Sequence, residues 1–265
     1  MNDMKLAISN IGWKSDFDLL VYEQMCQYDF SGLEIAPTRI ITKAPYEHLK
    51  EALSFSQEML KKYGFCIPSM QSIWFGRNER LFHSLEERHL LLEYTKKAID
   101  YASIIGCGNL VFGCPRNRVV SSPDDYHEAV IFFKEIGEYA FSKHTCIGIE
   151  ANPPIYNTNF INDTESAIKL IIDVNSRGFL LNLDVGAMVY NQESVDLLKG
   201  SVNLINHVHI SEPYLKPIEK REIHQQLSAI LKNESYMGYI SIEMGTQENM
   251  NIIMNTMKYV KEVFG

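Results

Sequence analysis

Four acidic or imidazole residues in the second half of the chain each end an apolar, β-like run. They are Glu150 in CIGIEAN, Asp184 in FLLNLDVG, His209 in NHVHISE and Glu243 in YISIEMG. Charged side chains are costly to place in apolar strands unless a partner compensates them. The four residues occupy equivalent places in four successive strand–helix units, which indicates that they share one partner. Carboxylates with an imidazole suit a divalent cation such as Mn²⁺, Mg²⁺, Co²⁺ or Zn²⁺.

Each of these residues, taken alone, also has an ordinary structural explanation. A strand-end carboxylate can pair with an arginine, and a core histidine can be held by hydrogen bonds. Four such residues at the same height on successive strands are hard to explain as separate accidents. The sequence therefore favours a joint metal-binding or catalytic centre.

The elements that must position these residues alternate along the whole chain. Eight short runs are typical of strands: Lys5–Ser9, Gly32–Ile35, Cys66–Gln71, Asn109–Phe112, Cys146–Glu150, Phe179–Asp184, Ile205–Ile210 and Tyr239–Glu243. Eight strand–helix units predict an α/β fold, a single-domain (β/α)8 TIM barrel over residues 1–265. A doubly wound open sheet is the alternative, but no glycine-rich phosphate loop follows the first run.

Strand alternation predicts which side chains face the mouth of this barrel. The inward set should be small or polar and comprises Gly148, Glu150, Asn152, His207, His209, Ser211, Ser241 and Glu243. The intervening apolar set should face the helices and comprises Ile147, Ile149, Val208, Ile210, Ile240 and Ile242.

Start signals precede several of the expected helices. Ser84 with Glu87, and Asn162 with Glu165, each predict a capping box. Ser122 followed by Pro123 predicts a helix with proline at its first position. A last helix, packed against the barrel, is predicted by the stripe of Met250, Ile253, Met254, Met257, Val260 and Phe264.

Composition narrows the classes of partner. The 265 residues are 46% hydrophobic and 22% charged, which is ordinary for a globular domain. A net charge of −8 with scattered basic residues argues against a nucleic-acid partner. We see no signal peptide and no apolar stretch long enough to span a bilayer, so we expect a cytoplasmic protein without membrane contact. Five cysteines without paired spacing predict no disulfide framework.

Four further candidates for substrate binding lie in the first half. Glu34 and Gln71 end the second and third expected strands. Arg116 and Arg118 follow the fourth, and two arginines near a barrel mouth suit a phosphate or carboxylate. The alternative for each arginine is a solvated loop side chain.

Two tryptophans complete the set of candidate substrate-binding residues. Trp13 and Trp74 lie in the loops after the first and third expected strands. They either stack on a sugar at the mouth or pack on the barrel.

The chain resembles the xylose isomerase-like barrels, a superfamily of sugar isomerases and epimerases that also includes endonuclease IV. The resemblance covers nearly the whole chain and is most specific in GIEANP at Gly148–Pro153, LDVG at Leu183–Gly186, HVHISEPYL at His207–Leu215 and ISIEM at Ile240–Met244. In the ketose 3-epimerases of that superfamily, a Glu, an Asp, a His and a Glu at these strand ends bind one divalent metal, and the two glutamates move the proton. The resemblance thus implies metal ligands at Glu150, Asp184, His209 and Glu243, and catalytic roles for Glu150 and Glu243.

The chain departs from those epimerases at two places. Ala187 stands where they usually carry a histidine, and the loop Pro213–Pro217 lacks their usual arginine. Endonuclease IV needs more metal ligands than this chain offers, since Arg39, Met70 and Cys114 occupy the regions where they would be sought.

Together these features predict a metal-dependent isomerase or epimerase acting on a sugar or sugar phosphate, with an anionic substrate favoured. Two carboxylates from separate strands can supply an acid and a base, and a metal stabilises the enediolate formed by proton abstraction. The alternatives are an inosose-type dehydratase and a barrel that binds a sugar without turning it over.

Overall fold

Eight parallel strands form one sheet in the computed structural model, which describes residues 4–265. The strands are β1 (Lys5–Ser9), β2 (Gly32–Glu34), β3 (Ser69–Met70), β4 (Asn109–Phe112), β5 (Ile147–Glu150), β6 (Phe179–Asp184), β7 (Ile205–Ile210) and β8 (Tyr239–Ile242). Their order is β2-β1-β8-β7-β6-β5-β4-β3. Two isolated bridges, Gly32–Cys66 and Ile35–Met70, bring the two ends of the sheet together. The predicted (β/α)8 barrel is confirmed.

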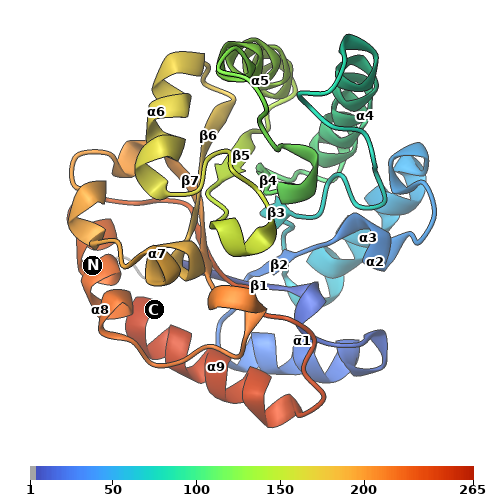
Figure 1. The fold of residues 1–265 in the computed structure, drawn as a ribbon. Helices are drawn as coiled ribbons and strands as arrows, with labels where there is room; N and C mark the ends of the chain where they lie inside the picture. The colour runs from blue at the N-terminus through green and yellow to red at the C-terminus, as the bar shows by residue number, and fades with distance from the viewer. Residues whose placement is uncertain (1–3) are drawn as a thin grey trace.

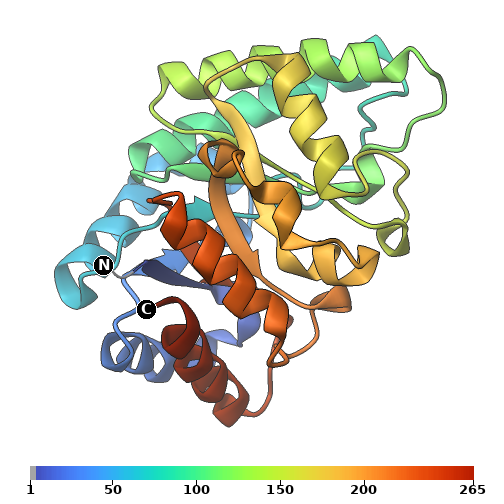
Figure 2. The ribbon, with the colours of Figure 1, turned by 90° about the vertical axis from the view of Figure 1, so that its left-hand side faces the viewer.

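Helices surround the strands on the outside of the barrel, as Figure 1 shows looking along its axis and Figure 2 from the side. They are α1 (Asp18–Gln27), α2 (Pro37–Ile40), α3 (Leu49–Tyr63), α4 (Leu85–Ile104), α5 (Asp125–Ser142), α6 (Thr164–Val174), α7 (Val185–Asn191), α8 (Glu222–Asn233) and α9 (Met250–Phe264). Among the described residues, no helix is both long and apolar enough to cross a membrane.

The third strand is much shorter than the sequence predicted. The expected strand Cys66–Gln71 is wrong, because only Ser69 and Met70 pair with β4. Pro68 lies inside the run and has no N–H to donate to a ladder. The other seven strands agree with the predicted bounds to within one residue at either end.

Two of the predicted helix starts are wrong in detail. α6 begins after Asp163, whose side chain accepts a hydrogen bond from the N–H of Ser166 at 2.7 Å. The predicted cap, Asn162, instead donates to the carbonyls of Asn152 and Thr158 in the preceding loop. Asp163 therefore takes the capping position, one residue later than predicted.

The start of α5 also differs from the prediction. Pro123 precedes the helix, which begins at Asp125. The carboxylate of Asp125 accepts hydrogen bonds from the N–H groups of Ser121 and Ser122, at 2.6 and 2.9 Å. These bonds fold the serine–proline segment into a turn that precedes the helix, so this segment does not form the first turn of α5. The start of α4 follows the prediction in part, because Ser84 caps the N–H of Glu87 at 3.1 Å.

The strands turn apolar side chains outward, toward the surrounding helices, and polar side chains toward the inside of the barrel. The predicted outward set of six aliphatic side chains on β5, β7 and β8 is fully buried in the core cluster. Inside, Asn109 donates hydrogen bonds to Ser69 at 3.0 Å and to Asn182 at 3.2 Å. These buried amides lie inside the barrel and help to fix the side chains at its mouth.

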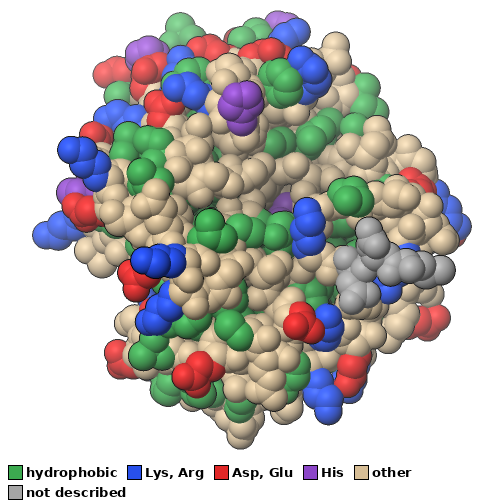
Figure 3. Space-filling model, turned by 180° about the vertical axis from the view of Figure 1, so that it is seen from behind, with side chains coloured by type: hydrophobic (Ala, Val, Ile, Leu, Met, Phe, Trp, Pro, Cys, Tyr) green, Lys and Arg blue, Asp and Glu red, His purple; other side chains and the backbone are tan. Residues whose placement is uncertain are grey.

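The surface of the molecule carries both signs of charge. Figure 3 shows, on the face seen from behind, lysine and arginine side chains interspersed with aspartate and glutamate. This face therefore presents a mixed surface, not a basic one.

Candidate metal and catalytic centre

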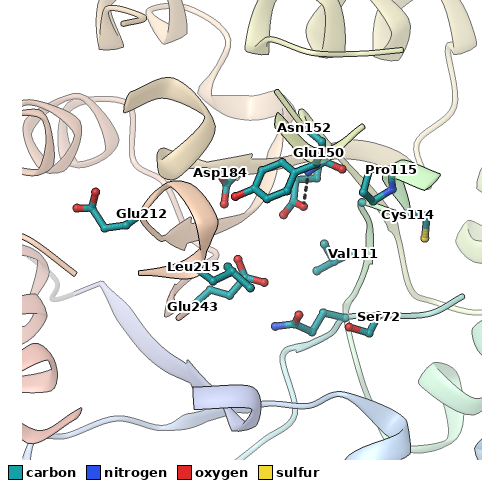
Figure 4. A pocket seen from close by; sticks show the side chains of 13 residues that line it. Ser72, Val111, Cys114, Pro115, Glu150, Asn152, Asp184, Glu212, Leu215 and Glu243 are labelled. Atoms are coloured by element: carbon teal, nitrogen blue, oxygen red, sulfur yellow. Dashed lines mark hydrogen bonds between the residues drawn. The ribbon is translucent and has the colours of Figure 1, made fainter. Parts of the chain in front are cut away.

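The four strand-end residues singled out in the sequence converge at the mouth of the barrel. Glu150, Asp184 and His209 lie on β5, β6 and β7, and Glu243 directly follows β8. Each offers one ligand atom, and these atoms all lie within 4.8 Å of one another. In Figure 4, Glu150, Asp184 and Glu243 are seen around one pocket. Four ligand atoms this close can surround a single cation.

The carboxylate of Glu150 is held by two amides. Its Oε1 accepts from Asn182 at 2.8 Å, and its Oε2 accepts from Asn152 at 3.1 Å. Arg118 in turn donates to the side-chain oxygen of Asn152 at 2.7 Å and to the backbone carbonyl of Glu150 at 2.8 Å. Gly113 packs against this carboxylate. A Cβ at position 113 would lie 2.9 Å from Oε2 of Glu150, so glycine leaves room that a larger residue would fill. The position of Glu150 is thus fixed from several sides.

Asp184 lies at the mouth of the barrel and also caps a helix. Its Oδ1 accepts from the N–H of Ala187 at 2.5 Å and so caps α7, while its Oδ2 accepts from the hydroxyl of Ser211 at 2.6 Å. The same hydroxyl oxygen accepts from the N–H of Gly186 at 2.8 Å. These bonds orient the carboxylate and leave it lone pairs for a cation.

His209 has carboxylates on both sides of its ring. Its Nδ1 lies 3.1 Å from Glu150 and 3.3 Å from Glu243. Its Nε2 lies 2.9 Å from Oε2 of Glu34, and the Nε2 of His207 lies 2.9 Å from the same oxygen. Glu34 accepts both bonds when each histidine carries its proton on Nε2, which directs the Nδ1 lone pair of His209 toward the cluster.

Burial and mutual repulsion shift the ionisation of the cluster. Burial, with the charges of Glu150 and Glu243, raises the pKa of Asp184 to about 8. Burial likewise raises the pKa of Glu243, although His209 opposes the shift. Burial alone would lower the pKa of His209, but Glu243 and Glu34 outweigh it, and the pKa is raised well above its usual value. A cation bound here would therefore compete with protons for the same atoms.

Glu34 is the charged partner beneath the cluster. Burial would raise the pKa of its carboxyl, but His209 and His207 outweigh burial and hold that pKa well below the usual value. Burial lowers the pKa of His207, so this imidazole is held in its neutral form. Gln71 donates to the other oxygen of Glu34 at 2.9 Å. Glu34 is thus an ionised carboxylate that orients two histidines.

The donor set fits a divalent cation. Three carboxylates and one imidazole nitrogen match the oxygen and nitrogen ligands of Mn²⁺, Mg²⁺, Co²⁺ or Zn²⁺. The Nδ1 of His209 faces two carboxylates, an arrangement that needs a positive charge between them, supplied by a proton or by a metal ion. A second group of possible ligands, Glu34, His207 and His209, uses the Nε2 atoms that are already hydrogen-bonded to Glu34. That group is therefore a support for the first.

We expect stabilisation by metal to grow as the pH rises from 6 to 8. The pKa of Asp184 rises from 3.8 to about 8 on folding, so the metal-free folded chain keeps a proton that the unfolded chain loses. This group thus contributes less to the stability of the metal-free protein as pH rises through that window. A bound metal ion would replace the proton, and the raised pKa of His209 acts in the same direction.

Thermal unfolding with and without Mn²⁺ at pH 6, 7 and 8 measures this effect. The gain in Tm should be largest at pH 8, and Asp184→Asn should flatten the trend. An equal gain at all three pH values in the wild-type protein contradicts the expectation.

A pocket of about 180 Å³ opens above the four residues. Besides Glu150, Asp184 and Glu243, its lining comprises Gln71, Ser72, Val111, Gly113, Cys114, Pro115, Asn152, Tyr156, Glu212 and Leu215. Burial raises the pKa of Tyr156 to about 12, so its hydroxyl keeps its proton at neutral pH. That hydroxyl oxygen accepts from the N–H of Tyr214 at 2.8 Å, which leaves its own proton free to donate.

The candidates from the first half of the chain divide between the pocket and the core. Gln71 lines the pocket, whereas Glu34 is fully buried beneath it. Arg118 is also fully buried and does not line the pocket, and Arg116 is exposed outside it. Arg118 therefore positions Glu150 and Asn152, and neither arginine forms an anion site in this pocket.

Both tryptophans lie in the core. Trp74 is 3% exposed, packs on Phe112 and donates to the hydroxyl of Thr95 at 2.8 Å. Trp13 is 1% exposed and donates to Asp18 at 2.8 Å. Neither lines the central pocket, although Trp13 lines a neighbouring cleft, and the burial of both side chains supports packing on the barrel.

Nine of the thirteen lining residues were not singled out as site residues from the sequence, among them Asn152, Tyr156 and Glu212. Asn152 shares the strand face of Glu150, and this alternation was the available signal. Tyr156 and Glu212 come from irregular segments whose course the sequence does not reveal. Both oxygens of the Glu212 carboxylate accept from Arg221 at 2.7 Å, so its charge is compensated within the chain.

Comparisons with known proteins agree with this architecture. The sequence profile of the family described as "Xylose isomerase-like TIM barrel" matches residues 24–263. A search of curated protein sequences found no match.

Several solved structures resemble this fold. The 3-keto-D-glucoside 4-epimerase YcjR from E. coli has 17% identity and a TM-score of 0.76, over 98% of this chain and 99% of its own. A D-psicose 3-epimerase from Clostridium cellulolyticum H10, solved with D-tagatose, has 13% identity and a TM-score of 0.74, over 98% and 99%. A D-allulose 3-epimerase from Methylomonas sp., solved with D-allulose, has 16% identity and a TM-score of 0.70, over 100% and 92%. At these identities the likeness shows the shared fold alone.

Proposed function

We propose that this chain, which belongs to the xylose isomerase-like TIM barrel family, is a metal-dependent sugar isomerase or epimerase. The observation that carries the proposal is the convergence of Glu150, Asp184, His209 and Glu243 within 4.8 Å at the barrel mouth. The structural neighbours named as epimerases of D-psicose, D-allulose and a 3-keto-D-glucoside support a sugar as the class of substrate.

The four side chains would hold the metal, and two of them would also move a proton. A divalent cation, when bound, polarises the carbonyl and hydroxyl oxygens of a sugar and so acidifies the neighbouring C–H bond. Glu243, with its raised pKa, suits the removal and return of that proton. Glu150 lies three strands away around the sheet, so it can serve the other face of the sugar. Gln71, Asn152 and Tyr156 supply amide and hydroxyl groups for the remaining substrate oxygens.

The charges around the pocket favour an uncharged sugar over a sugar phosphate. Four carboxylates line the pocket, of which Glu212 is paired with Arg221, and among the described residues no lysine or arginine lines it. A divalent cation would compensate only part of the negative charge of the other three, and a phosphate would be repelled by the remainder. The anionic substrate expected from the sequence rested on Arg116 and Arg118, which the structure places outside the pocket and in the core.

Hydrogen exchange from solvent tests the proposed reaction. Protein loaded with Mn²⁺ is incubated in D₂O with a panel of free ketoses, matching aldoses and D-fructose 6-phosphate, and deuterium on carbon is followed by NMR. We expect deuterium at a carbon next to the carbonyl of at least one uncharged sugar, with formation of its epimer or isomer.

The other outcomes separate the alternatives. Loss of water from the labelled sugar would identify the dehydratase instead. Binding of a sugar without exchange would identify the non-catalytic barrel. Exchange confined to the phosphate ester would contradict the assignment of an uncharged substrate.

A further inference from the structure

A second, larger cleft adjoins the central pocket at the barrel mouth. Its volume is about 620 Å³, against about 180 Å³ for the central pocket. Ser72 lines both cavities. Ligand pockets commonly measure about 300–1,000 Å³, so the central pocket alone is small and the two together are ample.

The wall between the two cavities is a tight turn after β3. Ser72 takes a left-handed conformation (φ 56°), and its carbonyl accepts from the N–H of Phe75 at 2.9 Å. The turn directs Trp74 into the core, where it is 3% exposed, and leaves Phe75 69% exposed beside the cleft. In Figure 4, Ser72 lies on the side of the pocket away from Asp184. An exposed aromatic side chain thus lines the cleft three residues after Ser72, the residue that the two cavities share.

The cleft offers polar groups with little net charge. Arg39 is paired with Asp18 at 2.7 Å, and Lys14 is paired with Glu248 at 2.6 Å. Thr38 adds a hydroxyl to the lining. An aromatic face combined with neutral hydrogen-bonding groups suits a polyhydroxylated ligand.

One buried amide group in the cleft lining lacks a partner. Asn10 follows β1 and is 1% exposed, and its Oδ1 accepts from the N–H of Ala36 at 2.9 Å. Its Nδ2 makes no hydrogen bond within the described chain. A buried amide nitrogen without an acceptor is unfavourable, and a ligand hydroxyl at this end of β1 would satisfy it.

We propose that the substrate is an extended sugar, a glycoside or disaccharide, whose reacting unit occupies the central pocket and whose second unit lies in the cleft beside Phe75. This inference rests on the proposed function, because it assigns the reacting unit to the same carboxylates. Phe75 sets the specificity for the second unit and takes no part in moving the proton.

A matched comparison of short and extended ketoses tests the inference. With Mn²⁺-loaded protein, the affinity and the rate of deuterium exchange are measured for D-fructose and for turanose, leucrose, palatinose and lactulose, which attach a second sugar at different positions. At least one of the disaccharides should bind tenfold or more tightly than D-fructose. Phe75→Ala should remove that advantage and leave D-fructose unchanged. Leu85→Ala, at another exposed apolar residue at the start of α4, should leave both unchanged.

Three results would overturn the inference, and they differ in what else they overturn. If free ketoses exchange but every disaccharide binds no better than D-fructose, the second subsite is absent and the proposed isomerase function stands. If no sugar of either length binds or exchanges, both proposals fail. An equal loss for D-fructose and the disaccharides in Phe75→Ala would also count against a role confined to the second unit.

Discussion

Glu243→Gln should slow exchange of the substrate's carbon-bound hydrogen by roughly 10²–10⁴-fold, the usual cost of losing a general base. Glutamine keeps the shape of the side chain but cannot accept the proton, so the variant should still bind sugar. The measurement is the rate of deuterium incorporation, together with the Kd for the same sugar. Glu135→Gln, on the outer surface of α5, is the matched control and should leave both unchanged.

Glu150→Gln should impair exchange from the opposite face of the sugar. The separation of binding from exchange distinguishes a lost base from a collapsed pocket. Full exchange in Glu243→Gln with every sugar that the wild-type protein labels would remove Glu243 from the reaction.

Glu34→Gln should weaken binding of Mn²⁺ by ~10–100-fold, the usual effect of removing a group that orients a metal ligand. One oxygen of Glu34 accepts bonds from both His207 and His209, and its charge balances the ring of His209. An amide in its place keeps the volume but loses the charge, so the Nδ1 lone pair of His209 is held less firmly toward the cluster.

Isothermal titration with Mn²⁺ measures this effect without recourse to activity. Gln71→Ala is the control, because it removes the contact to the other oxygen of Glu34 and leaves both histidine bonds in place. The control should lose much less affinity. If Glu34→Gln binds Mn²⁺ as tightly as wild type, Glu34 has no part in orienting His209.

The strand-end residues were predictable because their signal is local. A charged residue at the end of an apolar run is visible in the sequence, and the repeat of this feature on strands five to eight predicts that they meet. The barrel then follows from the alternation of strands and helices, and it places these four carboxyl ends at one mouth.

The supporting residues were not predictable, because their roles depend on contacts between distant segments. Glu34 meets His209 across 175 positions of sequence, and only the closed barrel brings them together. Left-handed conformations at Ser72 and Cys114 set the turns that place Trp74 and Arg118 in the core. Because neither is a glycine, no residue preference announced those turns.

The central claim is that Glu150, Asp184, His209 and Glu243 together hold one divalent cation. Equilibrium dialysis against Mn²⁺, followed by metal analysis of the protein, tests it most directly with wild type, His209→Ala and Glu135→Gln. We predict one Mn²⁺ per chain in the wild type and in Glu135→Gln, and a severe loss in a His209→Ala protein that remains folded by circular dichroism. Equal metal content in all three proteins, or none in the wild type at millimolar Mn²⁺ and pH 8, would contradict the account.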